Sequence, residues 1–296
     1  MASAASGLLP SDDPYFTVRQ VVVQKINEDR AAAGLGPVEL DSLSSQVGDQ
    51  HCQEMASNGY LSHWNLRGLL PYHRYHIAGG RDQVQENLSR MTIFSTRPNP
   101  FSTAPEDVLV NLLKAHQRFV DEKPPLDGHR KNVLDPAHTH VGIGLGVVGE
   151  NFTMAEEFLN RYVELEPLPE ILPRRSTEIK GLVLNKEFGP YYCVLFYEGW
   201  PQARTVDELN RTYAYEDMTG QIAARVPPWE MAFNSSSGRF RFNLSVKTLE
   251  PGYYHMVFWV RRPIRSIPYA LGSFGMYQVD TAGGIPCAGW VFHAEP

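Results

Sequence analysis

Two histidines and one or two glutamates are the residues of this sequence best placed to do chemistry. His63 closes the run Gly59-Tyr60-Leu61-Ser62-His63, Glu86 lies in Gln85-Glu86-Asn87, and His129 opens a segment that ends at Leu134. Each stands at the end of a different predicted element, so the side chains could point into one cleft. There they could share a divalent cation or polarise a bound ligand.

The spacing of apolar residues predicts three helices in the first half of the chain. The first begins at Pro14, behind two acidic cap residues, and ends at Gly34. The second runs from near Asp41 to Gly59, and the third begins at Pro105. These helices must position the loops that carry the candidate residues.

Residues 60–80, rich in Gly, Pro, Tyr and His, predict an irregular loop, and loops held by helices are where binding groups concentrate. His51 falls on the apolar stripe of the second helix, so we expect a hydrogen-bonded packing residue there. Residues 139–148 and 152–162 predict two strands of a hairpin. Helices followed by a hairpin are typical of an α+β domain.

The second half of the chain has a different pattern. A proline-bearing stretch, residues 164–178, predicts a semi-rigid linker. Beyond it, short aromatic and β-branched runs separated by turn residues predict strands at 179–184, 191–197, 222–226, 240–246, 253–260 and 289–293. We therefore expect a first domain over 1–163 and a small antiparallel β-sandwich over 179–296.

Composition excludes several classes of function. The chain has 296 residues, 43% of them hydrophobic, and a net charge of −6 without a basic block, so we expect no nucleic-acid partner. We expect no membrane span, because no apolar run approaches the roughly 20 residues that one needs. The N-terminus lacks the charged and apolar regions of a signal peptide. Of the three cysteines, Cys193 and Cys287 could pair in an oxidising compartment.

Several motifs, in order, resemble those of the CAP superfamily, which groups cysteine-rich secretory proteins, antigen five proteins and plant pathogenesis-related proteins. The motifs are Ile26-Asn27-Glu28-Asp29-Arg30, His51-Cys52-Gln53-Glu54-Met55-Ala56, Gly59-Tyr60-Leu61-Ser62-His63, Gln85-Glu86-Asn87-Leu88, Gly128-His129-Arg130-Lys131-Asn132 and His140-Val141-Gly142-Ile143-Gly144. The resemblance covers about residues 14–163, and the GHRKN form with few cysteines resembles the bacterial, secreted branch.

The resemblance implies an α-β-α sandwich with a concave cleft lined by two histidines and two acidic residues, a known place for a divalent cation, most often zinc. Carried over by position, the metal ligands are His63, His129 and Glu86. The second acid belongs to a Trp-x-x-Glu pattern that is nearest to Phe119-Val120-Asp121-Glu122 here, with phenylalanine in place of tryptophan. Glu122 is therefore the expected fourth ligand, and Asp121 is the alternative.

These observations favour a non-enzymatic CAP-domain protein, secreted or in the cell envelope. Its cleft would bind a divalent cation together with a small or lipid-like ligand, and its β-sandwich would attach to a protein partner or a surface. One alternative is a metal-assisted hydrolase, in which His63, Glu86 and His129 position the cation and Glu122 is the general base. Another is a structural or adhesin module whose histidines and glutamates only brace the cleft.

Overall fold

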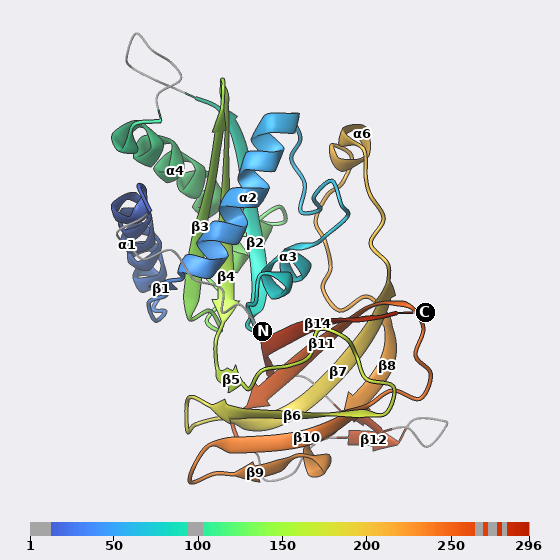
Figure 1. Cartoon of the computed structure of the whole chain (residues 1–296). Coiled ribbons are helices and arrows are strands. Elements are labelled where there is room, and N and C mark those ends of the chain that lie inside the picture. The colour runs from blue at the N-terminus through green and yellow to red at the C-terminus, as the bar shows by residue number, and fades with distance from the viewer. Residues whose placement is uncertain (1–12, 94–102, 264–268, 272–276, 280–282, 296) are drawn as a thin grey trace. The chain divides into compact units, whose positions relative to one another are not determined.

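The chain divides into two compact units, each with its own hydrophobic core (Figure 1). The structure is a computed structural model that describes residues 13–93, 103–263, 269–271, 277–279 and 283–295. Unit 1 comprises Met1–Gly80, Val84–Leu159 and Gln202–Tyr215, and unit 2 comprises Arg81–Gln83, Asn160–Pro201 and Glu216–Pro296.

Unit 1 is built on a four-stranded sheet with the order β1-β3-β4-β2. Its strands are β1 (Glu39–Leu40), β2 (Gln83–Thr92), β3 (His140–Val148) and β4 (Asn151–Asn160). β3 and β4 form an antiparallel hairpin, and β1 pairs with β3 in parallel. The predicted hairpin is thus confirmed, whereas β2, which carries Glu86, was not predicted as a strand.

The described part of this unit contains six helices: α1 (Phe16–Ala32), α2 (Ser42–Asn58), α3 (Pro71–Ile77), α4 (Pro105–Val120), α5 (Gly128–Val133) and α6 (Val206–Leu209). The predicted bounds of α2 are confirmed by its caps. The Asp41 side chain accepts the Ser44 N–H at 2.8 Å, and Gly59 ends the helix in the left-handed region with φ 75°. Among the described residues, no helix is both long and apolar enough to cross a membrane.

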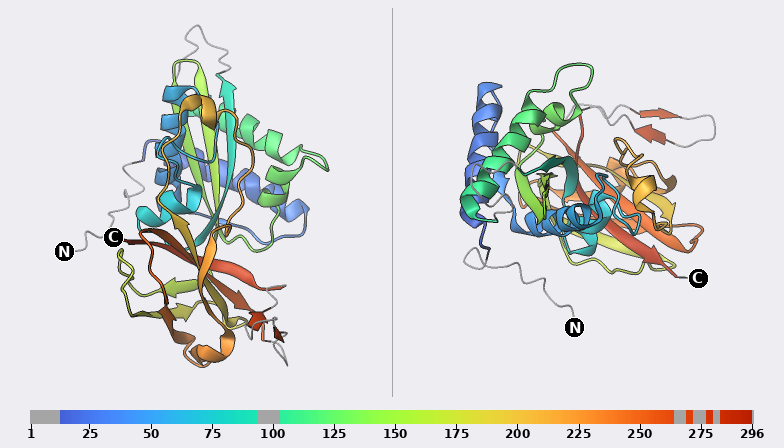
Figure 2. Two further views of the ribbon diagram at one scale, coloured as in Figure 1. Left: turned by 90° about the vertical axis from the view of Figure 1, so that its right-hand side faces the viewer. Right: turned by 90° about the horizontal axis from the view of Figure 1, so that it is seen from above.

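The two faces of β3 meet different helices, because successive side chains of a strand point to opposite sides. Val141 and Ile143 belong to the core that also contains buried residues of α1 and α4. Gly142, Gly144 and Gly146 face α2, so closely that a Cβ on Gly144 would lie 2.4 Å from the helix backbone. Figures 1 and 2 show α1 and α4 on one side of the hairpin and α2 on the other.

Unit 2 contains two four-stranded sheets, β5-β6-β10-β9 and β14-β11-β7-β8, and a separate two-stranded pair of β12 and β13. The strands are β5 (Val163–Leu165), β6 (Ser176–Val183), β7 (Gly189–Gly199), β8 (Gln221–Val226), β9 (Ala232–Asn234), β10 (Arg239–Ser245), β11 (Gly252–Arg261), β12 (Tyr269–Leu271), β13 (Tyr277–Val279) and β14 (Ile285–Ala294). A short 3-10 helix, Pro228–Glu230, precedes β9.

Side chains from both four-stranded sheets share one hydrophobic core. β10 alternates between exposed and buried residues, with Phe240 and Phe242 buried, as expected for a strand with one solvated face. β11 lies between β14 and β7, and its other face is buried too, through Val257 and Trp259. Each predicted strand of the second half has a counterpart, and the mixed α and β content is confirmed.

Three features differ from the predictions. Residues 60–80 contain the helix α3, whose side chains are aromatic, His and Arg and so give no apolar stripe. The predicted boundaries 1–163, 164–178 and 179–296 miss the return of Gln202–Tyr215 to unit 1, which follows from the full burial of Leu209 there. All three cysteines are buried and free, so Cys193 and Cys287 do not pair.

Candidate functional site

One cleft of ≈ 630 Å³ in unit 1 is lined by all four of the predicted site residues, His63, Glu86, Glu122 and His129. Its walls come from the loop after α2, from β2, from the region between α4 and α5, and from residues 212–215. The first three walls carry the motifs singled out in the sequence. The fourth wall belongs to a stretch that the sequence did not mark as functional.

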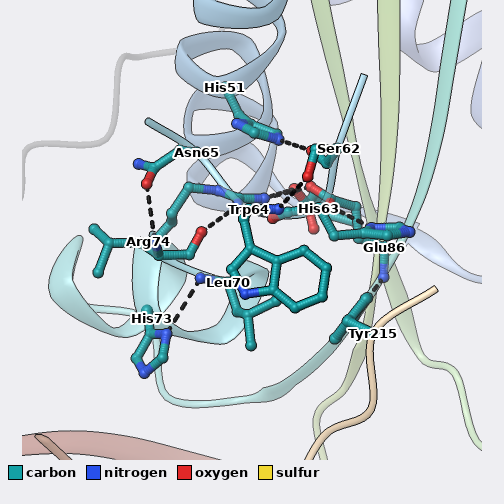
Figure 3. A network of polar contacts seen from close by, with 12 residues as sticks. His51, Ser62, His63, Trp64, Asn65, Leu70, His73, Arg74, Glu86 and Tyr215 are labelled. Carbon is teal, nitrogen blue, oxygen red and sulfur yellow. Dashed lines mark hydrogen bonds and ion pairs between the residues drawn. The ribbon is translucent and has the colours of Figure 1, made fainter. Parts of the chain in front are cut away.

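His63 and Glu86 form the first His–Glu pair of the cleft. His63 Nδ1 lies 2.8 Å from Glu86 Oε1, and the other carboxylate oxygen accepts a hydrogen bond from the Arg74 guanidinium (Figure 3). Arg74 also donates to the backbone oxygens of His63 and Leu69, at 2.6 and 3.0 Å. The buried arginine of α3 therefore holds both members of the pair.

Two buried carboxyl groups of this site, Glu86 and Glu157, have pKa values shifted in opposite directions. Burial by itself would raise the pKa of Glu86, but Arg74 and the hydrogen bond from His63 outweigh burial and hold this pKa well below its ordinary value. Burial, and then the charge of Glu86, raise the pKa of Glu157 well above its ordinary value. The surroundings therefore favour the ionised form of Glu86 and the neutral form of Glu157.

His129 and Glu122 form the second pair. His129 Nδ1 lies 2.5 Å from Glu122 Oε1, while Glu122 Oε2 accepts the backbone N–H of His129 at 2.9 Å. Asp121 instead accepts the side-chain amide of Gln117, so of the two candidate acids only Glu122 contacts the histidine. The Phe119 ring packs on the imidazole at 4.7 Å between centroids, at the position where the resemblance expects tryptophan.

Asn87 connects the second pair to the sheet. Its side-chain amide donates to the backbone oxygen of His129 at 3.2 Å and to the buried carboxylate of Glu156. The amide oxygen of Asn87 accepts the side-chain amide of Asn132 at 2.9 Å. The first turn of α5 is thereby fixed against β2, which explains why Asn87 and Asn132 accompany Glu86 and His129 in the sequence motifs.

Both imidazoles are oriented in the same way. Because a carboxylate only accepts hydrogen bonds, the Nδ1 atoms of His63 and His129 carry the protons, and neutral rings then present unprotonated Nε2 atoms. Within the part of the chain that the structure describes, neither Nε2 has a protein partner. The side chains are 14% and 37% exposed respectively, so both rings are within reach of a ligand in the cleft.

The glutamates occupy the positions of orienting groups. Among the described residues, no three His, Cys, Asp or Glu side chains lie together in a group that could hold a metal ion. A histidine that binds a metal usually donates its other ring N–H to a carboxylate. The donor set that this arrangement offers to a cation is thus the two Nε2 atoms, with Glu86 and Glu122 behind them.

His51 is the packing residue that its place in the helix predicted. It is 2% exposed, and its Nε2 bonds to the backbone oxygen of Ser62 at 2.8 Å. Burial, and then the neighbouring Arg74, lower the pKa of His51 to about 3, so the ring is neutral. Its role is to fix the backbone next to His63.

Sequence reasoning missed three side chains of the site: Arg74, Glu157 and Tyr215. Arg74 lies in the unpredicted helix α3, and Glu157 lies among apolar strand residues. The Tyr215 ring packs on His63 with 4.6 Å between centroids, and its hydroxyl accepts the Glu86 N–H at 3.2 Å (Figure 3). Since Tyr215 is 129 positions from Glu86, no local pattern could have found it.

Comparison with known proteins agrees with the resemblance seen in the sequence. The family model of CAP, the cysteine-rich secretory protein family, matches residues 23–158. YkwD of Bacillus subtilis (strain 168) is 24% identical over 141 residues, which are 47% of this chain and 46% of YkwD. The chain thus spans about half the length of this relative.

Two solved structures are similar over about half of this chain. One is an extracellular protein of Bacillus anthracis str. Ames that contains an SCP domain, with 21% identity, a TM-score of 0.34, and coverage of 48% of this chain and 40% of the other. The second is an outer surface protein of Borrelia burgdorferi, with 15% identity, a TM-score of 0.38, and coverage of 49% and 93%. With its ordered motifs and the match at residues 23–158, the chain carries a CAP domain of the cysteine-rich secretory protein family.

Proposed function

We propose that the cleft of the CAP domain binds a divalent cation, zinc first, together with a small or lipid-like ligand. The observation that carries the proposal is the matching geometry of two histidines in one cleft. Each of His63 and His129 has Nδ1 on a glutamate and Nε2 without a protein partner among the described residues. Imidazole nitrogen is a common ligand of zinc, and a carboxylate behind it raises its basicity.

In this proposal His63 and His129 would hold the cation through Nε2, and Glu86 and Glu122 would fix the orientation of the rings. A bound cation would supply a positive charge to which an oxygen of the ligand is attracted. The role of Arg74 is to stabilise the ionised Glu86, and the role of Phe119 is to keep the His129 ring in place. The proposal therefore uses two protein ligands where the resemblance implies four.

The geometry favours binding over hydrolysis. As a general base, Glu122 would need a carboxylate oxygen directed at substrate or water, but its two oxygens accept hydrogen bonds from His129 Nδ1 and from the backbone N–H of His129. A panel of peptide, ester and polysaccharide substrates, assayed beside the His63→Ala/His129→Ala variant, tests the hydrolase alternative. Turnover that the double variant abolishes would replace the binding proposal with an enzymatic one.

The resemblance to secreted proteins supports a proposal for the place of action, to which we add a proposed role for unit 2. CAP proteins of the branch that this chain resembles are secreted, so we place it outside the cytoplasm or in the cell envelope. The β-sandwich expected over residues 179–296 would attach the protein to a partner or a surface.

Metal content and zinc titration test the proposal. The protein is prepared without chelator, and bound metal is measured for the wild type, His63→Ala, His129→Ala and a control, His140→Ala, whose side chain is outside the cleft lining. We expect about one zinc per chain, lost in both cleft variants because a single imidazole remains, and kept in the control. No zinc at any ratio, or equal loss in the control, would contradict the proposal and favour a bracing network.

A further inference from the structure

Residues 202–215 leave the strands of unit 2 and complete the wall of the cleft in unit 1. Their attachment is apolar at its centre. Leu209, at the end of α6, is fully buried in a cluster with Met55, Tyr60 and Leu88. A capping box between Thr205 and the third residue of α6 fixes the start of this short helix. The burial of Leu209 therefore attaches residues 202–215 to the hydrophobic cluster of unit 1.

Polar contacts fasten the segment on both sides of Leu209. The Arg204 guanidinium lies over the Trp64 ring at 4.8 Å. The Asn210 side chain accepts the Leu61 N–H at 3.3 Å and donates to the backbone oxygen of Gly59 at 3.4 Å. The hydroxyls of Thr212 and Ser62 are 2.7 Å apart. Residues 212–215 are therefore an ordered wall of the cleft.

Two tyrosines of this wall, Tyr213 and Tyr215, line the cleft. Tyr215 packs on His63 through its ring, whereas the Tyr213 side chain is 88% exposed although it lines the cleft. Leu126, from the region between α4 and α5, is 83% exposed and also lines the cleft. Two exposed side chains with apolar surface thus line the same cleft as several hydrogen-bonding groups, the combination that suits an amphipathic ring.

The charges of the cleft identify the kind of ring. No Lys or Arg side chain is found among the described residues that line it, so the protein itself offers no guanidinium or ammonium group to a phosphate or carboxylate. The carboxylate oxygens of Glu86 are taken by His63 and Arg74, and those of Glu122 by His129. A cationic group of a ligand would therefore find no free carboxylate. Apart from the proposed metal ion, the lining offers hydrogen-bonding and apolar groups, which suit a ligand without a charge of its own, because desolvating such a ligand costs least.

We propose that residues 212–215 make the cleft a binding site for a neutral, hydroxylated ring, the chemistry of an uncharged saccharide unit. Tyr213 and Leu126 cover the apolar face of the ring, and its hydroxyls bond to polar side chains of the cleft lining other than His63 and His129, whose Nε2 atoms are left to the cation. This inference rests on the proposed function and names the class of its ligand. It also assigns a role to a segment outside the region that the CAP family model matches.

Binding of two uncharged probes, cellotetraose and chitotetraose, is measured by NMR titration into the full chain, with and without zinc. Tetragalacturonate and phosphatidylglycerol vesicles serve as anionic comparators. We expect at least one uncharged probe to bind, and Tyr213→Ala to weaken that binding by about tenfold or more. The matched control is Trp229→Ala, which removes an exposed aromatic side chain from unit 2 and is expected to leave binding unchanged.

The outcomes separate this inference from the proposed function. If Tyr213→Ala still binds zinc but no longer binds the saccharide, both the inference and the proposed function are supported. If zinc binds and depends on His63, while neither uncharged probe binds at millimolar concentration, the inference is overturned and the proposed function stands. Preferential binding of the vesicles or of the anionic saccharide also overturns it, as does equal weakening in Tyr213→Ala and Trp229→Ala.

Discussion

Glu86 is the residue at which the polar groups of the cleft meet. Its carboxylate accepts hydrogen bonds from His63 and Arg74, and its backbone N–H donates a hydrogen bond to the hydroxyl of Tyr215. The buried arginine keeps Glu86 ionised, and the ionised carboxylate keeps the proton of His63 on Nδ1. A change at Arg74 is therefore transmitted to the imidazole without any contact between Arg74 and the ligand.

Glu157 shows why the surroundings favour the ionised form of only one carboxyl group in this cluster. Its carboxyl is 1% exposed and lies 3.9 Å from Arg74, whose closer hydrogen bond goes to Glu86. Two buried like charges beside one arginine would repel each other, so the carboxyl group farther from the arginine favours its protonated form. This shift could not be predicted from the sequence, because it depends on Glu86 and Arg74, which lie far from Glu157 in the chain.

Asp217 of unit 2 gives a pH-dependent prediction at the scale of one residue. Burial raises the pKa of its carboxyl from 3.8 to about 6, against the opposing effects of His255 and of a hydrogen bond from Gln83. The folded state thus holds the proton more tightly than the unfolded state. Stability is lost as pH rises between these two values, and the loss is complete above pH 6.

Asp217→Asn should therefore raise the free energy of unfolding by up to about 3 kcal/mol at pH 8, since one pKa unit corresponds to about 1.4 kcal/mol. The advantage should shrink as pH falls through the window and vanish near pH 3.8. Urea denaturation at a series of pH values measures it, with the exposed Glu230→Gln as the control for loss of charge. A variant no more stable than wild type at pH 8 would refute the pKa assigned to Asp217.

At the scale of elements, the interface between α2 and β3 positions one wall of the cleft. α2 carries His51, which fixes the backbone beside His63, and the helix can approach β3 only because alternate strand residues are glycine. Gly144 is the closest of these, with no room for a Cβ against the helix backbone. The spacing of the helix from the sheet is thus set by the absence of side chains.

Gly144→Ala is expected to push α2 away from β3 and to lower the free energy of unfolding by about 1–3 kcal/mol. The matched control is Gly36→Ala, because a Cβ on Gly36 meets nothing within 4 Å and its φ is not positive. That variant should stay within about 0.5 kcal/mol of wild type. Chemical denaturation compares the two, and equal stability would show that α2 has room to adjust.

Elements with local signals were predictable, and elements held only by distant contacts were not. The caps of α2 are sequence features, and so is the proline that begins α4. The helices α3 and α6 are short, at seven and four residues, and lack the apolar period of a longer helix. Strand β2 was missed because its buried residues include Gln83, Glu86 and Asn87, whose partners lie elsewhere in the chain.

At the scale of the whole molecule, the order of the chain does not follow the division into units. Residues 202–215 are flanked by strands of unit 2 and yet belong to unit 1, where they supply one wall of the cleft. The four predicted site residues could be found from motifs that lie in the first half of the chain. The wall that covers them could not, since its position depends on the burial of Leu209.

The central claim is that His63 and His129 present their Nε2 atoms to one cation. The most direct measurement is a zinc titration of the full chain, followed through the nitrogen resonances of its histidine rings. We expect the Nε2 signals of His63 and His129 to shift together and to saturate at about one zinc per chain, while their Nδ1 atoms stay protonated on Glu86 and Glu122. Unchanged Nε2 signals for these two rings, or shifts confined to other histidines, would contradict the account.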